Sequence, residues 1–154
     1  MKKIQEITRS LEVAAGPDTC YEAVCDIPGY LSWFRHVKSL DIKERDGEGR
    51  PARVYFTFDL LIKKGLQIVL LYEYDDAGRT LKFRSGGGNI AGASGYYHFR
   101  ELSPGRSRFV FRVKVDFGML LPKSLVEFLS GNVLDDFMAM VKTECERRDA
   151  HGPA

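Results

Sequence analysis

Apolar and polar residues alternate along most of the chain up to about residue 117, in segments that end at glycine, proline or aspartate. A repeat of two residues places alternate side chains on opposite faces of a β-strand. One apolar and one polar face are typical of an antiparallel sheet covered on one side, and long strands twist and curl. The pattern predicts strands over residues 4–13, 37–45, 52–61, 66–74, 81–85, 91–102 and 106–117, and a turn over the glycine-rich residues 86–89.

Two short helices are predicted between the first and second strands. A glycine and a proline precede the first of them, which covers residues 18–25. The second begins at Pro28, the residue type that suits a first helical turn, and ends at Trp33 or Phe34. Asp26 is placed to cap this second helix, because a carboxylate accepts hydrogen bonds from the free amides of the first turn. Together the two helices would plug one end of a curved sheet.

A long apolar helix is predicted at the end of the chain, from Pro122 to about Arg148. Burying some eight of its side chains contributes roughly 12–24 kcal/mol before ordering entropy is subtracted. We therefore expect this helix to cover the concave face of the sheet. Its stripe recurs at spacings of three and four, at Leu125, Phe128, Leu129, Val133, Phe137, Val141 and Cys145.

The predicted fold class is α+β: a curved antiparallel sheet of six to seven strands around a long C-terminal helix, with two short helices after the first strand. A chain of 154 residues fits one domain with a sizeable core. We expect a single domain over residues 1–148 and a disordered tail over residues 149–154.

Composition narrows the function classes. Hydrophobic residues make up 44% of the chain, the net charge is only +2, and Lys and Arg are scattered along the sequence. Nucleic-acid binding is therefore not expected. No apolar run is long enough to cross a membrane and no signal peptide is present, so a cytoplasmic location is expected. The three cysteines form no CxxC motif or Cys/His cluster, and neither a metal ion nor a cofactor is expected.

Three segments resemble the START-like (helix-grip) superfamily, and within it the polyketide cyclase/dehydrase and coenzyme Q-binding branch. Residues 14–26 read AAGPDTCYEAVCD, and residues 30–34 read YLSWF, like the two short helices of the family. Residues 95–99 read GYYHF and are similar to the family's G-x-W-x-F strand, with Tyr97 where tryptophan is common. The resemblance implies a helix-grip fold with a deep apolar pocket for lipids, quinones, polyketides or similar molecules.

Strand parity and helical spacing predict which side chains would line such a pocket. The alternative is that the same residues fill the interior as a solid core, and the pattern alone does not separate the two. Mutual contact of Tyr97, Phe111 and Phe137 without a void would defeat any function that needs the pocket, whether that of a carrier or of an enzyme. The candidate ligand-binding residues are Trp33, Phe34, Phe56, Phe58, Ile68, Leu70, Tyr72, Phe83, Tyr97, Phe99, Phe111, Val113, Leu129, Val133 and Phe137.

The polar content of the predicted pocket decides between a carrier and an enzyme. The resemblance implies that cyclases place arginine and hydroxyl groups on the pocket face of their middle strands. Here that face, residues 66–74, offers only the phenols of Tyr72 and Tyr74. No catalytic residue is therefore assigned, and His36 and His98 are expected at the surface. The first hypothesis is a non-enzymatic carrier of a hydrophobic molecule such as a quinone or another isoprenoid lipid.

The second hypothesis is a polyketide cyclase or dehydratase with Tyr72 or Tyr74 as proton relay, which Arg53 or Arg84 inside the pocket would favour. A third is a protein-interaction module with a filled core.

Two apolar segments with flanking lysines, residues 60–66 and 117–123, suggest a further partner. They would either form a pocket entrance that touches a membrane surface transiently, or fold over each other and seal the cavity.

Overall fold

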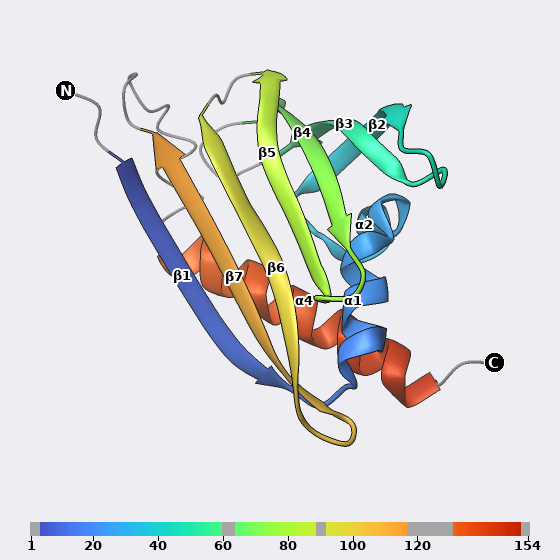
Figure 1. Cartoon of the computed structure of the whole chain (residues 1–154). Coiled ribbons are helices and arrows are strands. Elements are labelled where there is room, and N and C mark those ends of the chain that lie inside the picture. Colours follow the sequence, from blue (N-terminus) through green and yellow to red (C-terminus); the bar gives the residue numbers. More distant parts are fainter. Residues whose placement is uncertain (1–3, 60–63, 89–91, 117–130, 152–154) are drawn as a thin grey trace.

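The computed structural model describes residues 4–59, 64–88, 92–116 and 131–151. One antiparallel sheet lies against the helices, and α4 crosses behind it (Figure 1). The elements are β1 (Ile4–Val13), α1 (Pro17–Cys25), the 3-10 helix η1 (Ile27–Gly29), α2 (Tyr30–Trp33), β2 (Val37–Arg45), β3 (Pro51–Phe58), β4 (Leu66–Asp75), β5 (Thr80–Gly88), β6 (Ala93–Ser103), β7 (Arg106–Asp116) and α4 (Gly131–His151).

The sheet has seven strands in the order β1-β7-β6-β5-β4-β3-β2. Strands β2 to β7 form a meander, and β1 closes the far edge by pairing with β7 over its whole length. Every pair is antiparallel. The arrangement confirms the predicted α+β helix-grip fold, with the short helices between β1 and β2 and the long helix on one face.

Two predicted boundaries are wrong. The glycine-rich turn over residues 86–89 is not found, because β5 continues to Gly88 and pairs there with Ile68 of β4. Leu71 packs closely over Gly86, so that a Cβ atom at Gly86 would lie 2.9 Å from the Leu71 Cγ. At the other end of the chain, residues 149–151 belong to α4 instead of a tail.

The end of α4 is tied to the connection between β1 and α1. Glu146 accepts a hydrogen bond from the Ala14 amide at 2.8 Å, and Asp149 accepts one from the Gly16 amide at 3.4 Å. These two bonds explain why the helix extends beyond its predicted end, since its last turn has partners in the fold.

The stripe of α4 is buried over most of its described part. Phe137, Val141 and Cys145 are each at most 1% exposed, whereas Val133 is half-buried. The Cys145 thiol lies against the Cys20 carbonyl of α1, so the stripe packs on the first helix as well as on the sheet.

Charged residues join α4 to the plug. Asp26 caps η1 as predicted, with its carboxylate accepting from the Gly29 amide at 3.3 Å. The same carboxylate accepts from Arg148 at 2.9 Å. Glu144, only 4% exposed, accepts from Arg148 at 2.6 Å and from Arg147 at 2.7 Å. Because a buried carboxylate is costly without such partners, the fold depends on keeping these bonds.

Acid should weaken this connection. Hydrogen bonds from Arg147, together with those from Arg148, hold the pKa of Glu144 below its usual range despite burial. A lowered pKa in the folded state stabilises the fold above the unfolded-state value of about 4.3, and this contribution is lost as the pH falls through the folded-state value.

We expect Glu144→Gln to lower the free energy of unfolding at neutral pH and to approach the wild type only at a pH below the lowered folded-state pKa of Glu144, where that carboxyl is protonated. Urea unfolding at neutral pH and in acid measures this. Glu101→Gln, at an exposed position of β6, is the control. A gap between Glu144→Gln and the wild type that is equal at both pH values would contradict the expectation.

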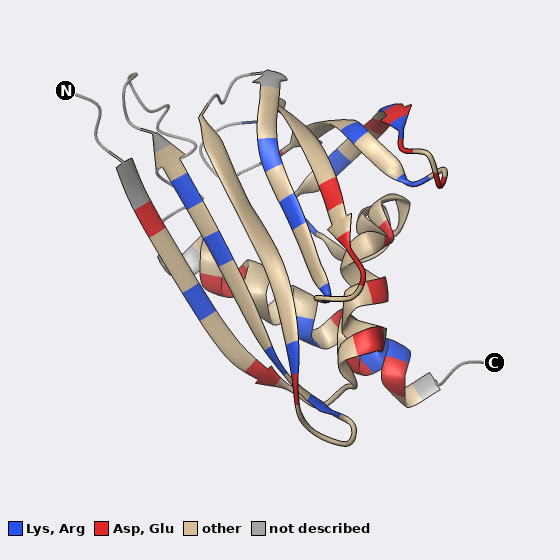
Figure 2. Ribbon diagram, viewed as in Figure 1, with Lys and Arg blue, Asp and Glu red and all other residues tan. Residues whose placement is uncertain are grey.

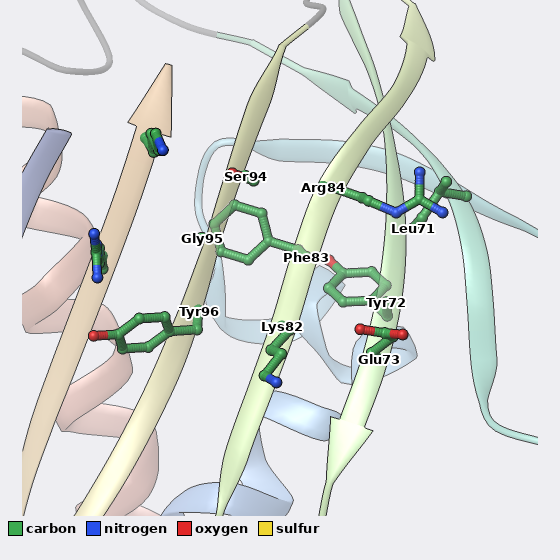
Figure 3. Close-up of a pocket in the computed structure, with 11 residues that line it drawn as sticks. Leu71, Tyr72, Glu73, Lys82, Phe83, Arg84, Ser94, Gly95 and Tyr96 are labelled. Carbon is green, nitrogen blue, oxygen red and sulfur yellow. The ribbon is translucent and has the colours of Figure 1, made fainter. Parts of the chain in front are cut away.

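Gly95 lets the sheet bury an aromatic ring. The Phe83 side chain extends from β5 toward Gly95 of β6 (Figure 3) and stacks on Phe111 of β7, with ring centroids 5.9 Å apart. A Cβ atom at Gly95 would lie 2.7 Å from the Phe83 ring and 2.0 Å from the Arg112 carbonyl oxygen. Only glycine therefore fits at this position without a shift of the backbone.

Gly95→Ala is expected to lower the free energy of unfolding by roughly 1–3 kcal/mol, the usual cost of overpacking. Gly47→Ala is the matched control, because a Cβ atom there meets nothing within 4 Å. Urea unfolding of both variants measures the difference. Equal stability of the two would show that the sheet adapts to the added methyl group.

Candidate functional site

The interior between the sheet and α4 is filled by aromatic rings near β6 and β7. The ring centroids of Tyr97 and Phe111 lie 5.2 Å apart, and Phe137 of α4 lies 5.9 and 5.0 Å from them. Phe99 and Phe109 stack at 4.9 Å in the same strands. Three rings in mutual contact leave no room for a ligand between them, so the pocket expected at this place is not formed there, and any ligand would have to lie beside this cluster.

Inner-face positions on β4 and β5 are less completely covered. Ile68, Leu70 and Phe83 are half-buried, whereas the large inner-face side chains of β6 and β7 are buried: Tyr97, Phe99, Phe109, Phe111 and Val113. Phe83 pairs with Tyr72, the next inner-face residue after Leu70, so the half-buried residues adjoin one another. The accessible apolar surface of the inner face is therefore concentrated beside Tyr72.

Tyr72 carries a polar group into this region. Its hydroxyl is buried and has no hydrogen-bond partner within the described part of the chain. Its ring meets Phe56 edge-on at 6.5 Å. Burial raises the pKa of the Tyr72 phenol well above its ordinary value, and the neighbouring phenols of Tyr97 and Tyr74 add to the shift. The hydroxyl therefore stays protonated and can donate a hydrogen bond to a guest molecule.

Two neighbouring phenols of the interior have partners. Tyr30 donates to the Val24 carbonyl. Tyr74 donates to the Pro51 carbonyl at 2.5 Å. An unpartnered buried hydroxyl costs about 1–3 kcal/mol. Of these three phenols, Tyr72 is the one without a hydrogen-bond partner among the described residues.

The candidate residues named from the sequence divide into three groups by exposure. Leu129 lies outside the residues that the structure describes. Trp33, Ile68, Leu70, Phe83 and Val133 are half-buried, and the indole N–H of Trp33 is buried without a partner in the described part. The remaining candidates are buried: Phe34, Phe56, Phe58, Tyr72, Tyr97, Phe99, Phe111, Val113 and Phe137.

Tyr30 was missed as an interior residue. It is 2% exposed, its ring stacks on Phe56 at 6.2 Å, and it meets Trp33 edge-on at 5.1 Å. Its spacing of three from Trp33 and four from Phe34 on a predicted helix is the signal that could have found it.

The arginines that would favour an enzyme if they lay inside the pocket are on the outer face of the sheet. Arg53 donates to the Tyr55 hydroxyl at 3.0 Å on the outer face of β3, and Arg84 is exposed on the outer face of β5 (Figure 3). His98, also on the outer face, contacts the Thr80 hydroxyl at 2.9 Å. His36 is half-buried with its ring against Phe34 at 6.1 Å, so the expected solvated position is wrong.

The apolar segments proposed to touch a membrane lie mostly outside the described residues. Residues 60–63 and 117–123 are not described, and of the first segment only Lys64, Gly65 and Leu66 are. Leu66 is buried at the start of β4. Among the described helices, none is both long and apolar enough to cross a membrane. In the same residues, no group of three His, Cys, Asp or Glu side chains is arranged to hold a metal ion.

The chain also matches a protein-family model, and the fold described above agrees with that match. The family model described as polyketide cyclase / dehydrase and lipid transport matches residues 5–147. The chain belongs to this family. The predicted START-like resemblance is thereby confirmed, and the family has a ligand-binding fold. No curated protein matches the chain.

Solved structures share the fold. The Zhui aromatase/cyclase from a Streptomyces species has a TM-score of 0.80 at 24% identity and covers 99% of this chain and 100% of its own. A START superfamily protein from Mycobacterium smegmatis has a TM-score of 0.74 at 17% identity, with coverage of 95% and 97%. Norcoclaurine synthase from Thalictrum flavum has a TM-score of 0.68 at 14% identity, with coverage of 92% and 86%. At these identities the similarity shows the fold alone.

Proposed function

We propose that this protein binds an apolar small molecule that carries one hydrogen-bond acceptor, and that it acts as a carrier. The ligand would lie against the inner faces of β4 and β5, with its acceptor at the Tyr72 hydroxyl. The unpartnered phenol beside half-buried Ile68, Leu70 and Phe83 is the observation that carries the proposal. Quinones and other isoprenoid lipids with a carbonyl or hydroxyl group have this chemistry.

Burial gives such a ligand its affinity. Covering apolar surface contributes about 25 cal/mol per Å², while a single neutral hydrogen bond adds about 1 kcal/mol and fixes the orientation. The aromatic cluster of Tyr97, Phe111 and Phe137 would form a rigid wall at one side of the ligand. A flat or branched hydrocarbon would complete the core that the side chains leave incomplete.

Charge placement favours a carrier over a catalyst. Cyclisation of a poly-β-ketone passes through enolates, which a cationic group would stabilise. Arg53 and Arg84 both lie on the outer face of the sheet, and Tyr72 is kept protonated by burial. Among the described residues, the interior thus offers a proton donor at Tyr72 with neither Arg53 nor Arg84 beside it.

A cyclase or dehydratase remains the second candidate function, supported by the family and by the similarity to the Zhui aromatase/cyclase. In that case the Tyr72 hydroxyl would act as proton donor to an oxygen of the ketone chain.

The variant Tyr72→Phe tests whether the Tyr72 hydroxyl binds the ligand or stabilises the fold. We expect the variant to gain about 1 kcal/mol in free energy of unfolding without ligand, because an unsatisfied buried group is removed. Its affinity for prodan, an uncharged naphthalene ketone, should fall about five- to tenfold. Fluorescence titration and urea unfolding measure the two effects. Tyr74→Phe, which loses its bond to Pro51, should lose stability instead. Unchanged prodan binding by Tyr72→Phe would place the acceptor elsewhere.

Neighbouring leucines on opposite faces of β4 locate the site. Leu70→Arg would put a charge on the inner face and is expected to abolish prodan binding, whereas Leu71→Arg, on the outer face, should preserve it. Native mass spectrometry and solvent extraction of the purified proteins would identify any bound lipid. Equal binding by both variants would exclude the inner face as the binding site.

The cyclase hypothesis has its own test. Turnover of a poly-β-ketone thioester to a cyclised product by the wild type, with loss of turnover but retained binding in Tyr72→Phe, would support it. Binding without any product by the wild type, followed by chromatography, is the expected outcome for a carrier.

A further inference from the structure

The outer face of the sheet, away from the interior, holds a groove of about 340 Å³. It crosses four strands, from β4 to β7 (Figure 3). Basic residues occupy β5 and β7 on either side of β6 (Figure 2). The side chains that line it on this face are Leu71, Glu73, Lys82, Arg84, Ser94, Tyr96, Arg112 and Lys114.

The strand register arranges the cations in two rows. In one row Arg84, Ser94 and Lys114 are cross-strand neighbours. Adjacent strands lie about 4.8 Å apart, so the backbones of Arg84 and Lys114 are roughly 10 Å apart with the Ser94 hydroxyl between them. Arg84 extends toward Leu71 in the structure (Figure 3), and a change of rotamer would let it and Lys114 reach one anion above Ser94.

The second row differs in its charge balance. Lys82, Tyr96 and Arg112 are cross-strand neighbours, and Lys82 faces Glu73 on its other side. Arg112 is paired with Glu6 at 2.5 Å. The cations of this row therefore have carboxylates beside them, and what the row adds to the groove is the Tyr96 ring.

The first row has a surplus of positive charge. No ion pair joins Arg84 or Lys114 to a carboxylate within the described part of the chain. Glu6 lies opposite Lys114 in the register, but its carboxylate is bound by Arg112. Leu71 is the neighbour of Arg84 on β4. The row thus combines two cations, a hydroxyl and an apolar side chain.

We propose that this groove binds a small phosphate-bearing molecule with a flat organic group. The phosphate would lie above Ser94, accepting hydrogen bonds from Arg84, Lys114 and the Ser94 hydroxyl. Arginine suits this role because its guanidinium binds two phosphate oxygens at once. The organic group would rest on Tyr96 in the adjacent row.

A small molecule fits the groove better than an acidic protein surface does. The excess charge is confined to one row, and Glu73 would repel an extended acidic partner that continued along β4. The cations of the site lie on the outer face, because Lys82 and Arg84 point away from the face on which Phe83 lies. Tyr72, Phe83 and Gly95 also border the groove, so it adjoins the proposed interior site, and the two are told apart by their different ligands.

Phenyl phosphate is the probe for this site. Titration followed by amide NMR shifts should show saturable binding, with the largest shifts at Ser94, Gly95 and Lys114. The double variant Arg84→Gln/Lys114→Gln should bind at least about tenfold more weakly, since two charge-assisted hydrogen bonds are lost. Its prodan binding should be unchanged, which distinguishes loss of the groove from loss of the fold or of the interior site.

The matched control is Lys38→Gln/Arg100→Gln, which removes two exposed cations outside the groove. Its affinity for phenyl phosphate should stay within about twofold of the wild type. Equal weakening in both double variants would show only general attraction and overturn the proposal. So would equal affinity for inorganic phosphate and phenyl phosphate, or binding of poly-glutamate without binding of phenyl phosphate.

Discussion

The packing of Phe137 holds the elements of this fold together. Its ring contacts Phe34 of the plug at 5.0 Å and the rings of Tyr97 and Phe111 in the sheet. A sheet with one apolar face is stable only when that face is covered, and α4 provides the cover through a single stripe of side chains. Because the helix, the plug and the central strands all meet at one ring, the position of α4 over the sheet is fixed there.

That constraint divides the interior into two parts. Near β6 and β7 the rings fill the volume, with Phe99 and Phe109 stacked as well. Near β4 and β5 the inner residues keep accessible surface, and Tyr72 has a hydroxyl that the fold does not satisfy. The solid core is thus found beside β6 and β7, whereas a hollow beside β4 and β5 stays part of the proposal. A rigid wall beside an incomplete core is an arrangement that can accept a guest without reorganising the sheet.

The sequence was sufficient for the fold because its signals are local and repeated. Alternation along β7 and the stripe of α4 predicted the sheet, the helix and their facing surfaces, and Asp26 was correctly assigned as a cap. The extension of β5 through its glycines was not predictable, since it depends on Leu71 packing over Gly86. The alternation of apolar and polar residues shows which side chains share a face, but it does not show which of them touch one another. The basic residues looked scattered for the same reason: Arg84 and Lys114 are distant in the chain and become neighbours of Ser94 only through the register.

One pair of small residues shapes both faces of the sheet. Gly95 has no side chain on the inner face, and this allows Phe83 to cross β6 and stack on Phe111. Ser94, beside it, has only a short side chain on the outer face, and the groove runs above it. Successive side chains of a strand point to opposite faces of the sheet, so Ser94 and Gly95 belong to different surfaces. Because both residues are small, little side-chain volume covers β6 on either face at this place. The aromatic core gains a contact across the strand, and the outer face gains a hollow between two basic strands. A larger residue at Ser94 would fill only the outer hollow, whereas one at Gly95 would meet both the Phe83 ring and the Arg112 carbonyl oxygen. The outer surface can therefore be changed alone, but the inner position is coupled to the backbone that carries the groove.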